Sequence, residues 1–136
     1  MNDVDFHEEQ MALFDAFNKR LQAYAAAPEG EGFSELAQQC AALAADSGQI
    51  MDEAPALIYR MLTIAPQFAQ EFPRDLLWYL GQECLHFMPD EEIERFALLD
   101  EQRRAADSQG QRFDWSQACA MMRSLQSEEQ NAQTRH

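Results

Sequence analysis

The stretch PRDLLWYLGQECLHFM, residues 73–88, decides how this chain must fold. It opens on a proline, which is tolerated in the first turn of a helix, and it lacks the period-two alternation of a strand. On a wheel of 100° per residue, its apolar side chains cover about 200°, which is too wide for a helix lying on a surface. We therefore predict one central helix over 73–88, with Gly81 allowing a neighbour to approach closely.

The segments on both sides of this stretch also carry apolar residues at the spacing of a helical face. Prolines and glycines separate them, and Asp52 and Asp114 are expected to cap the helices that follow them. The remaining predicted helices cover 4–25, 33–46, about 53–65, a short turn at 66–72, 90–104 and 115–126. The chain is thus expected to be all-α: an irregular bundle of five to seven antiparallel-packed helices in a single domain, 1–126, followed by a frayed or disordered tail, 127–136.

Composition narrows the classes of partner. Hydrophobic residues make up 46% of the chain, so it can form a core, but 24 acidic residues against 10 basic ones leave a net charge of −14. Such a surface repels phosphate and anionic lipid, so we expect no nucleic acid, no membrane and, if anything, a partner with a basic surface. Three scattered cysteines without a C-x-x-C pair indicate reduced thiols. Together with the lack of an N-terminal hydrophobic signal, they predict a cytoplasmic protein. We expect it to be a monomer or a homodimer.

One polar strip runs along the predicted central helix. Asp75, Tyr79, Gln82, Glu83 and His86 share about 100° of the wheel, which makes them a candidate ligand site. Glu83 and His86 form a Glu-x-x-His pair, the spacing that helical di-metal sites use twice. Only one such pair exists here, so the simpler interpretation is the wet face of a mostly buried helix, and no metal or cofactor is expected.

A second candidate surface is acidic. Asp90, Glu91, Glu92 and Glu94 stand at the start of the predicted helix that follows Pro89. Two explanations remain open. The carboxylates can complement the positive end of the helix dipole, or they can form a surface for a basic partner. Of these two, the dipole requires no partner.

Aromatic residues at helix edges leave a similar choice. Tyr59, Phe68, Phe72 and Phe113 stand at helix edges or connections, where they can close the core or form an interface.

No phosphate loop, nucleophile elbow or other catalytic motif is present, so we do not expect an enzyme. The sequence predicts a small acidic helical interaction protein: a regulator, adaptor or inhibitor that acts by binding another protein. The alternative is a ligand- or metal-binding helical domain, with enzymatic activity left open, that uses Asp75, Tyr79, Glu83 and His86.

Overall fold

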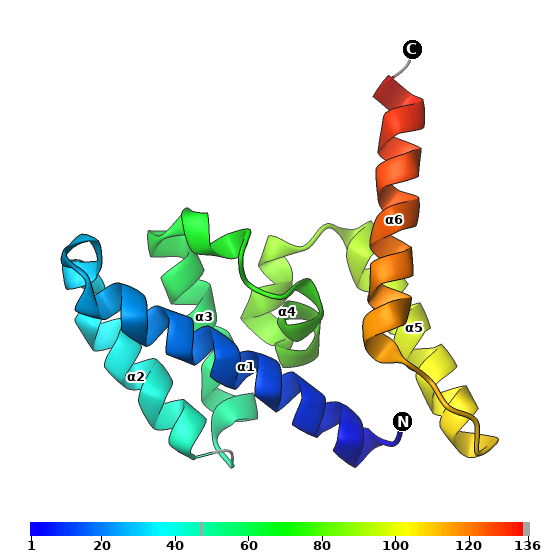
Figure 1. Ribbon diagram of the computed structural model, residues 1–136, viewed down its shortest axis with the longest axis horizontal. Coiled ribbons are helices and arrows are strands. Elements are labelled where there is room, and N and C mark those ends of the chain that lie inside the picture. The colour runs from blue at the N-terminus through cyan, green and yellow to red at the C-terminus, as the bar shows by residue number, and fades with distance from the viewer. Residues whose placement is uncertain (47, 135–136) are drawn as a thin grey trace. The chain divides into compact units, whose positions relative to one another are not determined.

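The computed structural model describes the backbone of residues 1–46 and 48–134, and the side chains of 1–46 and 48–125. In these residues every regular element is helical and no strand occurs, so the all-α prediction is confirmed (Figure 1). None of the helices in this part of the chain combines the length and the apolar character that a membrane span requires. The elements in order are α1 Asp3–Ala26, η1 Pro28–Phe33, α2 Ser34–Ala45, α3 Ile50–Ile64, η2 Pro66–Ala69, α4 Arg74–Leu80, η3 Gln82–Phe87, α5 Asp90–Ser108 and α6 Trp115–Thr134, where η denotes a 3₁₀ helix.

Contacts between residues divide the chain into two units. The first comprises Met1–Phe6 and the residues from Asp90 onward, and the second comprises His7–Pro89. The predicted single domain over 1–126 stays a prediction. The predicted tail, 127–136, falls where side chains are not described, and residues 135–136 lie outside the described backbone.

The core of the second unit forms around one face of α1. Phe14, Phe17 and Leu21 are at most 2% exposed, at the helical spacing that the sequence shows. Phe17 meets the ring of Phe72 edge-on, with 4.7 Å between centroids. Phe68 packs in the same way against Tyr24 of α1, at 5.0 Å. Two of the four edge aromatics, Phe68 and Phe72, thus close the core, whereas Tyr59 is 39% exposed.

The stretch 73–88 is buried as expected, but it is not one helix. Leu76, Leu77 and Leu80 of α4 are at most 2% exposed. At Gly81 the backbone takes φ 68° and ψ −152°, a region essentially confined to glycine, and the chain restarts as the 3₁₀ helix η3. The single helix predicted over 73–88 is therefore wrong, because Gly81 ends α4 instead of admitting a neighbour.

The caps predicted from the sequence have different outcomes. Asp114 accepts a hydrogen bond from the backbone N–H of Gln117 at 3.0 Å, which confirms it as the cap of α6. Asp52 is not the cap of α3, because that helix already begins at Ile50, with Gln49 before it. Pro55 lies inside this helix and is buried.

The first unit is built around Trp115 and Arg103. The Trp115 ring meets Phe6 at 4.6 Å between centroids and stacks on Phe96 at 6.3 Å. The Arg103 guanidinium, 2% exposed, lies 4.5 Å from the centre of the Phe6 ring. These contacts join the first residues of α1 to α5 and α6.

Arg103 also makes a set of polar contacts. Its Nε donates to Asp100 Oδ1 at 3.0 Å, its Nη2 to Asp3 Oδ1 at 2.8 Å, and its Nη1 to the carbonyl oxygen of Met1 at 3.0 Å. Burial alone would lower the pKa of Arg103, but the hydrogen bonds to Asp3 and Asp100 outweigh it and raise that pKa above its ordinary value. The guanidinium therefore stays charged although it is buried.

Candidate functional site

The predicted polar strip is divided by the break at Gly81. Asp75 and Tyr79 lie on α4 and meet two side chains of α1. Tyr79 Oη is 2.5 Å from His7 Nδ1, and Gln10 donates to Asp75 Oδ2 at 3.2 Å. The other members of the strip, Gln82, Glu83 and His86, belong to η3.

Two residues of η3, His86 and Glu83, have surroundings different from those of Asp75 and Tyr79. His86 is exposed, and its ring packs edge-on against Tyr59 of α3, with 5.7 Å between centroids. Glu83 is half-buried, and its Oε2 has no hydrogen-bond partner among the described residues. No group of three His, Cys, Asp or Glu side chains in the described part of the chain is arranged to hold a metal ion.

His7, Gln10, Asp75 and Tyr79 form a polar cluster between α1 and α4. Two of its residues, His7 and Gln10, are absent from the candidate site predicted from the sequence. His7 and Gln10 are three apart on α1, and Gln10 is fully buried, with its Oε1 unpaired among the described residues. The spacing of the sequence could have predicted the burial of Gln10, because this residue lies four positions after Phe6 and four before Phe14, on the buried face of the helix. A ligand-binding role for Asp75 and Tyr79 stays a prediction, with His7 and Gln10 as their neighbours.

Cys84 lacks the properties of a nucleophile. Its thiol is fully buried and lies 3.6 Å from the carbonyl oxygen of Pro55, to which it donates. Burial, and then the charge of Glu83, raise the pKa of Cys84 to about 12. The thiol is therefore protonated at neutral pH, which is the inert form.

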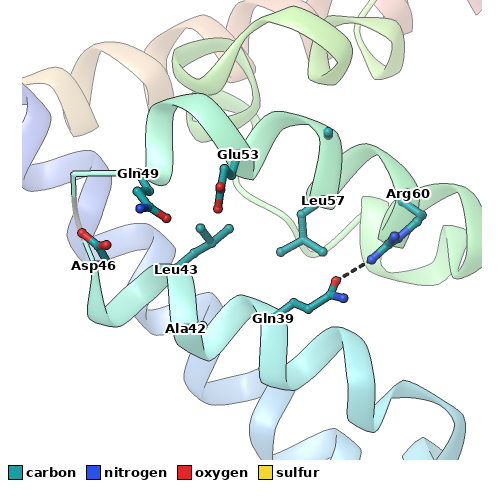
Figure 2. A pocket seen from close by; sticks show the side chains of 9 residues that line it. Gln39, Ala42, Leu43, Asp46, Gln49, Glu53, Leu57 and Arg60 are labelled. Carbon is teal, nitrogen blue, oxygen red and sulfur yellow. Dashed lines mark hydrogen bonds between the residues drawn. The ribbon is translucent and has the colours of Figure 1, made fainter.

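A groove of about 630 Å³, with both polar and apolar side chains in its lining, runs between α2 and α3 (Figure 2). Asp46 and Glu53 stand at one end, and Arg60 stands at the other, where it donates a hydrogen bond to Gln39 across the groove. Leu43 and Leu57 lie between these ends, and both are buried. The charged side chains that line this groove are exposed, so water already satisfies them.

A second groove, of about 350 Å³, lies between α5 and α6 within the first unit, and it is apolar. Leu98 of α5 is 54% exposed, and Met121 and Leu125 of α6 are 62% and 59% exposed. The remaining lining residues are Arg95, Leu99, Gln102, Ala118 and Met122. Three large apolar side chains thus face water on the same surface, which we call the α5–α6 groove.

The predicted acidic surface begins at the same helix. Asp90 is the first residue of α5, and Glu91 and Glu94 are exposed beside it, whereas Glu92 is half-buried. Glu91 lies one turn before Arg95, and Glu94 lies one turn before Leu98, so both are next to the lining of the α5–α6 groove. The position at the helix start agrees with the dipole explanation, and the position beside the groove agrees with the partner explanation.

Comparison with known proteins places the chain in a family. No curated protein matches it, and no solved structure does. The family model described as PA2817-like matches residues 2–133, which is nearly the whole chain. The chain therefore belongs to the PA2817-like family.

Proposed function

We propose that this protein acts by binding another protein, as a regulator, adaptor or inhibitor, and that the α5–α6 groove holds that partner. The observation that carries the proposal is the exposure of Leu98, Met121 and Leu125 together along one apolar groove. Large apolar side chains that gather on a surface typically mark an interaction site, whereas scattered ones do not. Two of the lining residues are methionines, whose flexible side chains adapt to the shape of a partner.

The α5–α6 groove can supply part of the free energy of a specific contact, because the rest must come from the other contacts of the partner. Burying a fully exposed Leu or Met side chain contributes about 1.5–3 kcal/mol. Each of the three side chains has slightly more than half of its area left to bury, so each can contribute about 1 kcal/mol. Together they supply about 3 kcal/mol, which is roughly a hundredfold in the dissociation constant.

The groove between α2 and α3 offers less. Its large apolar side chains, Leu43 and Leu57, are already buried, and the exposed apolar side chains of its lining, Ala42 and Ala56, are small. A ligand there would gain little apolar burial and would have to displace water from exposed charged groups, and such an exchange contributes little.

Site-specific photo-crosslinking in the native cells tests the proposal. A photo-crosslinking amino acid placed at Gln102, which lines the α5–α6 groove and is exposed, should form an adduct with a different polypeptide. The same amino acid at Gln38, an exposed position of α2, is the matched control and should not. Adding Leu98→Gln and Met121→Gln should remove the adduct at position 102.

Three results would contradict the proposal. They are the absence of any adduct at position 102, an adduct of equal yield at position 38, or an adduct that survives the two groove substitutions. Adducts are identified by mass spectrometry, so that a second copy of the same chain is recognised.

A further inference from the structure

The two sides of the α5–α6 groove differ in charge. On the α5 side, Glu94 and Glu101 flank Leu98, at four residues before it and three after it, and both are exposed. On the α6 side, Gln117 and Ser124 occupy the corresponding positions around Met121, and they are neutral. The groove therefore has one acidic edge, defined here as Glu94 and Glu101, and one neutral edge. Arg95, the cation in the lining itself, already takes part in an interaction within the protein.

The carboxylates of the acidic edge are not neutralised by any side chain that the structure describes. Among the residues whose side chains are described, neither Glu94 nor Glu101 has an ion-pair or hydrogen-bond partner. Asp100 on the same helix differs, because it is bound by Arg103 and by Arg104. The charges at the edge of the groove thus remain available to a cation from outside.

The length of the groove fits a helix. Its lining extends from Arg95 to Gln102 on α5 and from Ala118 to Leu125 on α6. Seven residues of α-helix correspond to about 10.5 Å, or two turns. A third helix laid along the groove would place apolar side chains at positions i, i+3 or i+4, and i+7 over this length, as in helix-in-groove recognition.

Building on the function proposed above, we propose that the partner presents an amphipathic helix to the α5–α6 groove, with Lys or Arg along one flank only. That flank faces Glu94 and Glu101, which are themselves seven residues apart and so match basic side chains at i and i+7 of the partner. The other flank, beside Gln117 and Ser124, is uncharged.

The charges argue against two other occupants. A second copy of this chain would bring another acidic edge and another net charge of −14 to the same place, and like charges brought together oppose binding. An anionic membrane surface would be repelled by the same carboxylates. A basic amphipathic helix satisfies both the apolar groove and its acidic edge.

Defined peptides test the inference. Three fluorescein-labelled peptides of about 20 residues, long enough to form helices, are compared. Two of them carry the same apolar stripe along one helical face, and the third does not. The first carries Lys along one flank of the stripe, the second carries Glu at the same positions, and the third has the composition of the first in scrambled order. Binding to the full chain is measured by fluorescence anisotropy at low and at moderate salt.

We expect the Lys peptide to bind about tenfold or more tightly than the Glu peptide, and to weaken as salt rises. The scrambled peptide should not bind, because it lacks the stripe. Glu94→Gln with Glu101→Gln should weaken the Lys peptide by about three- to tenfold and reduce its preference over the Glu peptide. Glu31→Gln with Glu53→Gln removes the same charge from exposed positions of the second unit and should leave both affinities unchanged.

The outcomes separate this inference from the proposed function. If Leu98→Gln with Met121→Gln abolishes binding but the Lys and Glu peptides bind equally, the groove is the site and the basic flank is wrong. If Glu31→Gln with Glu53→Gln weakens the Lys peptide as much as Glu94→Gln with Glu101→Gln does, net charge and not the acidic edge attracts the peptide, which also overturns the inference.

If Leu98→Gln with Met121→Gln leaves the affinity for the Lys peptide equal to that of the unmodified chain, the proposed function fails together with the inference. If sedimentation shows a dimer that the groove variant loses, the occupant is a second copy and both proposals are wrong.

Discussion

Replacing Arg103 with Met should destabilise the first unit far more than the same replacement at Arg104. The two arginines are neighbours in sequence and both bind Asp100, at 2.8 Å and 2.7 Å. They differ in burial, since the Arg103 side chain is 2% exposed and that of Arg104 is 69% exposed. The comparison therefore tests the buried ion pair together with the contacts that Arg103 makes with Asp3, the carbonyl oxygen of Met1 and the Phe6 ring. Methionine retains most of the length of the arginine side chain.

The expected magnitude follows from what remains after each change. Breaking a buried ion pair typically costs about 3–5 kcal/mol, because one charge is left uncompensated. Here Asp100 keeps its contact with Arg104, so Arg103→Met should cost less, about 2–3 kcal/mol. Arg104→Met removes an exposed pair and should cost about 0–1 kcal/mol. The contact of Arg103 with Asp3 adds little, because the Asp3 side chain is 85% exposed.

Urea unfolding followed by the fluorescence of Trp115 measures both values, in a Trp78→Phe background so that only the first unit is observed. This choice matters because the chain has two units, and a single transition cannot be assumed. A double variant, Arg103→Met with Asp100→Leu, should recover part of the loss, because an apolar pair replaces a buried ionic one. A loss below about 1 kcal/mol for Arg103→Met, or an equal loss for Arg104→Met, would refute this reasoning.

Two further predictions concern the second unit. Gly30→Ala should cost about 1–3 kcal/mol in thermal or urea unfolding, because a Cβ there would lie 2.0 Å from the carbonyl oxygen of Tyr24; Gly32→Ala, which meets nothing within 4 Å, should change stability by less than about 1 kcal/mol. Equal effects of the two substitutions would show that the close packing of η1 on α1 is wrong. Burial raises the pKa of Cys40 and of Cys84 from about 9 to about 12, so a disulfide reagent at about pH 8 should label neither until the protein unfolds. Because the folded state holds these protons, stability should be unaffected below pH 9 and should fall as the pH rises from 9 toward 12; rapid labelling of the native protein would contradict this prediction.

Much of the fold follows from local patterns in the sequence. The apolar spacing in 4–25 and the breaks at Pro66 and Pro89 predict elements that the structure contains. The break at Gly81 could not be found in the same way, because apolar residues continue on both sides of it and Cys84 and Met88 are buried like those of a continuous helix. Six residues are too few to distinguish a period of 3.0 from one of 3.6.

The candidate sites show a different limit. Periodicity assigns Leu125 to the same face as Trp115 and Cys119, yet Leu125 is 59% exposed while the other two are buried. The pattern identifies an apolar face, but it does not say how far along the helix that face is covered by another element. Met121 lies off the face shared by Trp115, Cys119 and Leu125 and is 62% exposed, and it belongs to a groove that only the packing of α5 and α6 defines.

The way in which the chain closes its first unit has a consequence for the order of folding during synthesis. The second unit, His7–Pro89, is one continuous stretch, so all of its residues emerge from the ribosome before those of α5 do. The first unit needs Met1–Phe6 as well, and its contact between Asp3 and Arg103 spans 100 residues. The length of the loop adds only slowly to the free energy of closing it, by about 0.6 kcal/mol for each doubling, but the contact cannot form until the later residues exist. The contacts of Asp3 with Arg103 and of Phe6 with Trp115 can therefore form only after the residues of the second unit have emerged, so Phe6, which is buried in the complete protein, waits for Trp115 until then.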